Sequence, residues 1–184
     1  MKSLMRELRQ EHKALRQLIL LLQRKLNMLE NDIPLNYRLI EDVINYIEDF
    51  ANAYHHPKED VIYHYIIDHN LDDRGQFHKI LQEHKTLLPL TQSIKATLHS
   101  ILLDIIVSRE TFISELSTFI EAQKAHLDSE DQCVFPLIEP LLNEKDWVII
   151  LQNLPEKVED PIFGKEIHSS YQDLYNRLQI VEEN

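Results

Sequence analysis

The chain has 184 residues and a formal net charge of −12, with only two glycines and one cysteine. This length suits one domain with a hydrophobic core, and so few glycines leave little material for the tight turns of a sheet protein. The acidic charge argues against a nucleic-acid partner, and no apolar run reaches the roughly 18 residues that a membrane span needs.

The lone Cys133 excludes an internal disulfide framework and fits a reducing compartment. The first twelve residues, MKSLMRELRQEH, lack the apolar stretch of a signal peptide. Leucine, isoleucine, glutamate, lysine and glutamine are abundant, which favours long helices. The composition therefore predicts an all-helical, cytoplasmic protein.

The first predicted helix runs from about Ser3 to Leu29 and ends before the segment NDIP at 31–34. Its apolar residues recur at alternating intervals of four and three, which places them on one helix face. His12 is the only polar residue on that face. The face comprises Met1, Met5, Leu8, His12, Leu15, Ile19, Leu22, Leu26 and Leu29.

The second predicted helix spans roughly Asn36 to Asp68, and two polar residues interrupt its apolar face. Pro57 cannot donate a hydrogen bond to the carbonyl of Ala53, so we expect a kink there. The face comprises Ile40, Ile44, Ile47, Ala51, His55, Glu59, Ile62 and Ile66.

The third predicted helix begins near Gln76, after the segment NLDDRG at 70–75, and Pro89 is expected to bend it. A single histidine, His84, interrupts the early part of its apolar face. That face comprises Phe77, Ile80, His84, Leu87, Thr91, Ile94, Leu98, Ile101 and Ile105.

The fourth predicted helix follows Ser108, whose hydroxyl suits an N-cap, and it loosens at Pro136 and Pro140. Its inner face again carries a histidine and a glutamate four residues apart. This face comprises Phe112, Leu116, Phe119, Gln123, His126, Glu130, Cys133 and Leu137.

The remaining residues form a smaller tail. Asp146 is a candidate cap for a short helix, DWVIILQNL, and a loop and a last amphipathic helix follow. We therefore predict an up-down four-helix bundle at 1–142 and a helical extension at 143–184 that packs on it.

Two of the polar interruptions are His-x-x-x-Glu pairs, His55 with Glu59 and His126 with Glu130. Positions i and i+4 share a helix face, so each pair can direct an imidazole and a carboxylate to the same point. A single inward histidine, such as His12 or His84 taken alone, is usually a hydrogen-bonded core residue. Ionised carboxylates in an apolar core, however, cost several kcal/mol each unless they are paired or bind a metal.

In an up-down bundle these polar residues would fall in one layer near one end, where a shared cation would satisfy all of them. Imidazole and carboxylate without thiolate suit iron, manganese or zinc, and six ligands exceed the four of a closed structural zinc site. Two carboxylates able to bridge suggest two cations. The predicted ligands are His12, His55, Glu59, His84, His126 and Glu130.

Several nearby residues are not predicted to be ligands. His56 follows His55 by about 100° around the helix and is expected to point away from the site. Cys133 is predicted to be a small buried residue of the inner face. Gln123 suits either a hydrogen bond to a ligand or polar filling of the core. Tyr54 and Tyr63 flank the pair on the second helix, and the spacing selects neither.

The sequence pattern of His12, HHPKE (55–59), EH (83–84) and HLDSE (126–130) resembles the hemerythrin-like HHE cation-binding family. The contexts HHPKED and DSEDQCVFP are similar to its bacterial members, and DW (146–147) and DPIFG (160–164) match a C-terminal extension common in that group. The resemblance covers nearly the whole chain. It implies two iron ions (Fe2+/Fe3+), oxo- or hydroxo-bridged, that bind O2 or related small molecules.

Oxygen carriers of this family have a fifth histidine, from a His-x-x-x-His pair on the third helix, whereas Ile80 and Leu88 flank His84 here. We therefore expect one iron to keep an open coordination position, which favours sensing or chemistry over reversible carriage. One hypothesis is a module that senses or stores O2, NO, peroxide or iron. Another is a di-iron enzyme, either an oxidase, a peroxidase-like enzyme or a nitric-oxide-linked repair protein. A metal-free interaction bundle is a third.

Overall fold

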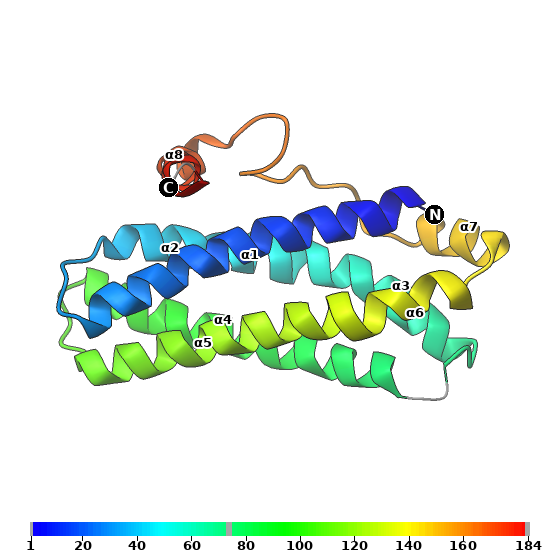
Figure 1. Ribbon diagram of the computed structural model, residues 1–184, viewed down its shortest axis with the longest axis horizontal. Coiled ribbons are helices and arrows are strands. Elements are labelled where there is room, and N and C mark those ends of the chain that lie inside the picture. The colour runs from blue at the N-terminus through cyan, green and yellow to red at the C-terminus, as the bar shows by residue number, and fades with distance from the viewer. Residues whose placement is uncertain (1, 73–74, 183–184) are drawn as a thin grey trace.

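The computed structural model describes residues 2–72 and 75–182, which form helices and connecting loops without a strand. The expectation of an all-helical chain is therefore confirmed. Within the described part of the chain, no helix is both long and apolar enough to cross a membrane. The long rods of the bundle (Figure 1) are α1 (Lys2–Glu30), α2 (Tyr37–Tyr46) continued by α3 (His56–Asp68), α4 (Gln76–Leu102) and α5 (Arg109–Ser129).

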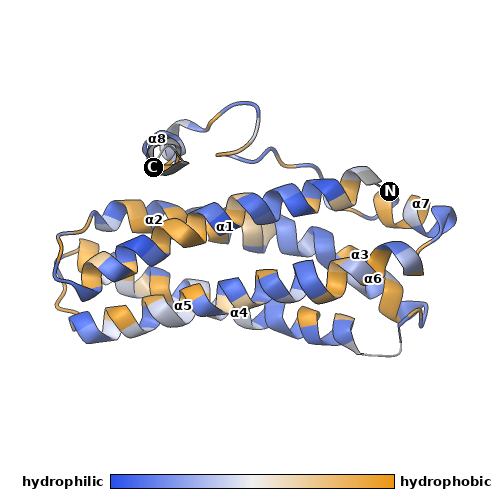
Figure 2. Ribbon diagram, viewed as in Figure 1, coloured by the Kyte–Doolittle hydropathy of each residue, from blue (hydrophilic) through white to orange (hydrophobic). Residues whose placement is uncertain are grey.

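Apolar faces hold the long helices together. Helix α1 packs against α5 and α2, and α4 packs against α2, α3 and α5. Figure 2 shows orange, hydrophobic residues alternating along each rod with blue, hydrophilic ones. Every member of the first two predicted faces is buried, except Met1, which lies outside the described residues. Helical periodicity thus located the core-facing side of both elements correctly.

Two π-helical segments interrupt the bundle. Segment η1 (Ile47–His55) joins α2 to α3, and η2 (Glu130–Val134) joins α5 to α6 (Phe135–Leu141). Each ends shortly before a proline, Pro57 or Pro136. A π-turn contains an extra residue, and such turns are frequent at functional sites. The predicted irregularity at Pro57 therefore takes the form of a π-segment upstream of the proline.

The second π-segment overturns one prediction from the sequence. Cys133 is exposed, whereas Val134 and Ile138 are buried at 2% and 0% exposure. The regular spacing had placed Cys133 and Leu137 on the inner face. Because the π-turn adds one residue after Glu130, the inward positions move on by one.

Two helix boundaries also differ from the predictions. Helix α4 ends at Leu102, and Asp104 follows with a φ of 57°, so Ile105 lies beyond the helix and is 56% exposed. Helix α7 (Glu144–Gln152) begins after Asn143, whose side chain caps it, while Asp146 accepts a hydrogen bond from the Asn143 backbone. Asp146 is thus the reciprocal partner in a capping box. Ser108 caps α5 as predicted.

The tail packs on the bundle at two places. Helix α7 contacts α3, and α8 (Gln172–Glu182) contacts α1 and α2 through buried Leu174 and Leu178. Between them, the hydroxyl of Tyr46 donates a hydrogen bond of 2.8 Å to Asp160. The tail therefore adds apolar surface to the core and a part-buried polar anchor.

The apolar core consists of two clusters. One contains the later part of α1, α2 and the apolar residues of α8, and the other contains Met5 and Leu8 of α1 together with Trp147 of α7. Along α1, His12 falls between Leu8 of one cluster and Leu15 of the other. A polar layer thus separates two water-excluding regions.

Candidate metal centre

The polar layer brings all the predicted ligands together from every long helix. Each has an exposed fraction of 8% or less. Nε2 of His12 lies 3.2 Å from a carboxylate oxygen of Glu59 and 3.2 Å from one of Glu130. The layer comprises His12 of α1, His55 of η1, Glu59 of α3, His84 of α4, His126 of α5 and Glu130 of η2.

The same ring nitrogen points inward in each of these histidines. Nε2 of His55 lies 3.3 Å from Glu59, and Nε2 of His126 lies 3.3 Å from Glu130. Nε2 of His84 is 3.7 Å from Glu59 and 3.4 Å from Glu130. The inward nitrogens therefore surround the two glutamates.

A carboxylate holds the outward nitrogen of every one of these imidazoles. An acidic partner at Nδ1 fixes the ring orientation and leaves the Nε2 lone pair for a cation. These partners are not among the residues predicted from the sequence. The pairs are His12 with Asp131 at 2.9 Å, His55 with Glu11 at 2.7 Å, His84 with Asp60 at 2.6 Å, and His126 with Glu83 at 3.3 Å.

A simple sequence signal marks all four carboxylates, since each one is the chain neighbour of a predicted ligand. Asp60 follows Glu59, for example, yet contacts a histidine of another helix. Adjacent residues point about 100° apart around a helix. A carboxylate beside an inward residue is therefore directed at the neighbouring helix.

Several inward atoms have no hydrogen-bond partner among the described residues. These are Nε2 of His55, His84 and His126, and Oε2 of Glu59 and Glu130. An unsatisfied buried polar atom costs about 1–3 kcal/mol, and more when it is charged. A cation bound between the carboxylates and the imidazoles would satisfy all of these atoms. The residues present therefore fit a metal centre.

Groups of opposite charge face one another in the layer. Burial by itself would lower the pKa of His12, but the neighbouring carboxylates of Asp131, Glu130 and Glu59 raise it well above its ordinary value. Burial likewise opposes protonation of His84, whose pKa is nevertheless raised to about 10 by Asp60 and the two glutamates. Burial would raise the pKa of Glu130, yet His126, His12 and His84 hold it well below its ordinary range. The carboxylates thus attract positive charge.

Two groups of candidate ligand atoms share one carboxylate. His12, His55 and Glu59 form one group, and Glu59 also belongs to a second group with His84, His126 and His56. Within each group, the ligand atoms lie within 4.8 Å of one another. Glu130 also contacts histidines of both groups, because one of its oxygens lies 3.4 Å from His84 and the other lies 3.2 Å from His12 and 3.3 Å from His126.

His56 lies inside the layer, which corrects the prediction that it points away. Its side chain is 4% exposed, and its ring stacks on that of His84 with centroids 4.3 Å apart. The prediction assumed that the inward side of the helix is one narrow stripe. The inward arc of a bundle helix is at least about 100° wide. His55 faces Glu11 of α1, and His56 faces α4 and α5.

Tyr63 is the tyrosine that reaches the layer. Its hydroxyl donates a hydrogen bond of 2.7 Å to Glu130, and its side chain is fully buried. Burial and the charges of Glu130 and Glu59 raise the pKa of Tyr63 well above its ordinary value, so the phenol stays protonated. The ring of Tyr54 instead packs beneath the ammonium group of Lys58.

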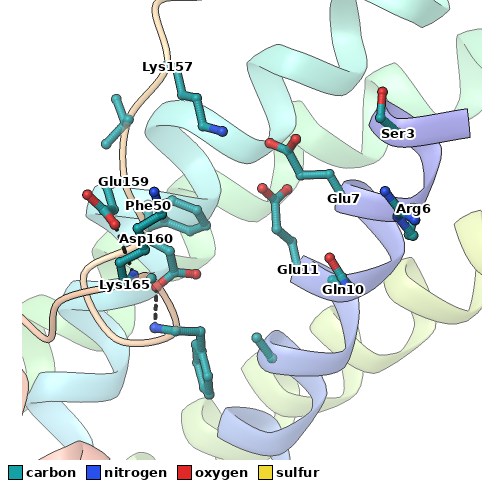
Figure 3. A pocket seen from close by; sticks show the side chains of 14 residues that line it. Ser3, Arg6, Glu7, Gln10, Glu11, Phe50, Lys157, Glu159, Asp160 and Lys165 are labelled. Atoms are coloured by element: carbon teal, nitrogen blue, oxygen red, sulfur yellow. Dashed lines mark hydrogen bonds between the residues drawn. The ribbon is translucent and has the colours of Figure 1, made fainter. Parts of the chain in front are cut away.

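A groove of about 900 Å³ lies between α1 and the tail segment at 157–165 (Figure 3). Figure 3 shows Glu7 and Glu11 extending from α1 toward the part of the tail that carries Lys157. Lys58 donates hydrogen bonds to both glutamates, of 3.2 Å to Glu7 and 2.5 Å to Glu11. Because Glu11 also holds His55, one carboxylate connects this groove to the polar layer.

Comparison with known proteins agrees with this geometry. A family model described as the hemerythrin HHE cation binding domain matches residues 3–138, which include all six predicted ligands. No curated protein and no solved structure matches the chain significantly.

Proposed function

The chain belongs to the hemerythrin HHE cation-binding family, and we propose that it is a non-heme di-iron protein that binds O2, nitric oxide or peroxide. Its role would be sensing, storage or a stress response. The proposed ligands are His12, His55, Glu59, His84, His126 and Glu130, with the two glutamates bridging two iron ions.

The sharing of Glu59 between two adjacent groups of donor atoms carries this proposal. A closed structural zinc site needs four ligands around a single ion. Here two groups of histidines share a carboxylate, which suits two neighbouring cations. The donors are imidazole and carboxylate, and these suit iron better than a thiolate-seeking metal.

The proposal extends to the architecture around the centre. We place the ligands in an up-down four-helix bundle at 1–142, with 143–184 as an extension packed on it, because each long segment supplies ligands to one layer. A chain with one exposed cysteine suits a reducing compartment, and the proposed location is the cytoplasm.

Bound iron would supply redox and small-molecule binding chemistry that these side chains lack. The chain's own residues orient and shield the centre. Asp131, Glu11, Asp60 and Glu83 hold the Nδ1 atoms so that the Nε2 atoms face inward, and the apolar clusters on both sides exclude water.

A di-iron enzyme is the second candidate, and the contact between Tyr63 and Glu130 favours it. The buried phenol lies 2.7 Å from a proposed bridging carboxylate. A positioned phenol can deliver a proton to a small molecule that reacts nearby. Oxidase, peroxidase-like or nitric-oxide-linked repair activity would use such a donor.

Anaerobic iron titration tests the metal assignment. The wild-type chain should bind two irons, and His126→Ala should lose at least one of them. The matched control is His99→Ala, which removes an exposed histidine from α4. Binding of one zinc and no iron by the wild-type chain would overturn the proposal.

Visible spectra recorded after adding O2, NO or peroxide to the reduced protein then separate the two candidate functions. A stable, reversible adduct supports a binding module. Rapid decay with a released product supports an enzyme.

A further inference from the structure

We propose that His56 is a fifth histidine ligand, so that the cation beside His84 and His126 is bound by three histidines and its neighbour by two. This inference rests on the proposed dinuclear centre and adds to it. The third nitrogen would come from the first residue of α3, directly after the predicted ligand His55.

The position of His56 supports this role. A ligand atom of His56 lies within 4.8 Å of ligand atoms of Glu59, His84 and His126. Its ring contacts both histidines, with centroids 4.3 Å from the His84 ring and 5.1 Å from the His126 ring. Binding to the same cation would require the His56 ring to turn out of its stack on His84, because Asp60 holds the His84 ring. His56 therefore borders the same space as the two histidines on that side of the layer.

The hydrogen bonding of His56 separates it from the other four histidines. Each of those has a carboxylate at Nδ1. For His56, neither ring nitrogen has a hydrogen-bond partner within residues 2–72 and 75–182, although the side chain is 4% exposed. A bond to a cation would give this imidazole the partner that no described residue supplies.

This assignment changes where an exogenous ligand would bind. From the sequence, the missing histidine on α4 implied an open position beside His84, because Ile80 is apolar. Ile80 is 1% exposed and belongs to the apolar core. If His56 supplies the third nitrogen on that side, the cation near His12 and His55 has fewer protein donors and offers the open position. Glu11, which holds His55, also lines the groove beside the tail.

The test compares iron binding by the wild-type chain, His56→Ala and His56→Phe. Phenylalanine keeps a ring in the core and removes both nitrogens, so it separates ligand loss from a packing defect. His64→Ala is the control, because it removes an exposed imidazole from the same helix. Each protein is titrated anaerobically with Fe2+ against a competing chelator, and circular dichroism checks its folding.

Both His56 variants should bind the first iron nearly as the wild type does, and should bind the second at least about 10-fold more weakly. His64→Ala should bind both irons normally. If the His56 variants also bind both irons with affinities within about threefold of the wild type, this inference is wrong and the dinuclear proposal stands. If the wild-type chain binds no iron, both fail.

A measurement on the wild-type chain decides the matter even if neither variant folds. Cobalt(II) bound in place of iron shifts the NMR signals of the ring protons on its histidine ligands. Five sets of shifted histidine signals are expected. Four sets would exclude His56 from the ligands.

Discussion

Nδ1 of His12 donates a hydrogen bond of 2.9 Å to the carboxylate of Asp131, although 119 positions separate the two residues along the chain. The contact is one of four that run around the bundle in one direction. Glu11 of α1 holds His55, Asp60 of α3 holds His84, Glu83 of α4 holds His126, and Asp131 beyond α5 returns to His12. Each helix therefore orients a histidine of the next.

The first prediction concerns this ring of carboxylates. Asp60→Asn keeps the size of the side chain but removes the negative charge that lies 2.6 Å from Nδ1 of His84. The iron affinity of the His84 side should fall by roughly 10- to 100-fold, the usual effect of losing such a partner. Chelator competition measures it. The control Asp68→Asn removes an exposed carboxylate from the same helix, and an equal loss in both variants would contradict a specific role.

The second prediction concerns Tyr63. Tyr63→Phe removes the only hydroxyl that donates to buried Glu130 among the described residues. The free energy of unfolding should fall by about 1.5–3 kcal/mol, the range for a hydrogen bond to a charged group. Urea unfolding with a chelator present measures it without a contribution from metal. Tyr65→Phe, which removes a hydroxyl bonded to the half-buried Asp146, should change stability less.

The third prediction distinguishes the observed register of η2 from the regular helix that the sequence predicts. Cys133 is exposed, so it should react fully with a thiol reagent in the folded protein. A cysteine placed at the buried next position, Val134→Cys in a Cys133→Ser background, should react only after denaturation. A protected Cys133 would show that the π-turn is absent in solution.

The fourth prediction concerns pH and the anchor of the tail. Burial of Tyr46 and the charge of Asp160 raise the pKa of its phenol well above the ordinary value of 10. Because the folded pKa is the higher one, the stabilisation is complete below pH 10. The stabilisation decreases as the pH rises from 10 toward the folded pKa. In this range the phenol loses its proton in the unfolded chain but keeps it in the folded one.

The thermal midpoint of the wild-type chain should therefore fall as the pH rises from about 10 to 11. Tyr46→Phe should be less stable at pH 8 and should lose less on going to pH 11. Tyr37→Phe is the control, since it removes a phenol from the same helix that does not bond Asp160. Identical pH profiles for the wild type and Tyr46→Phe would refute this account.

The sequence by itself determined which side of each long helix faces the core and which residues interrupt that side. Leu8, His12 and Leu15 repeat with the period of a helix, and all three are buried. The same period placed both His-x-x-x-Glu pairs inward. These features depend only on neighbours within two turns of one helix, so they can be read from the order of residues.

Only the tertiary structure decided which groups complete the polar layer. The sequence shows that Asp60 follows Glu59. Its contact with His84, however, requires α3 and α4 to lie side by side with these two residues at the same level along the bundle. The position of His56 likewise depends on how wide an arc of its helix faces the bundle interior. The position of Cys133 depends on the extra residue of η2. Packing between helices selects these arrangements, because burying apolar surface offsets the weaker hydrogen bonding of a π-turn.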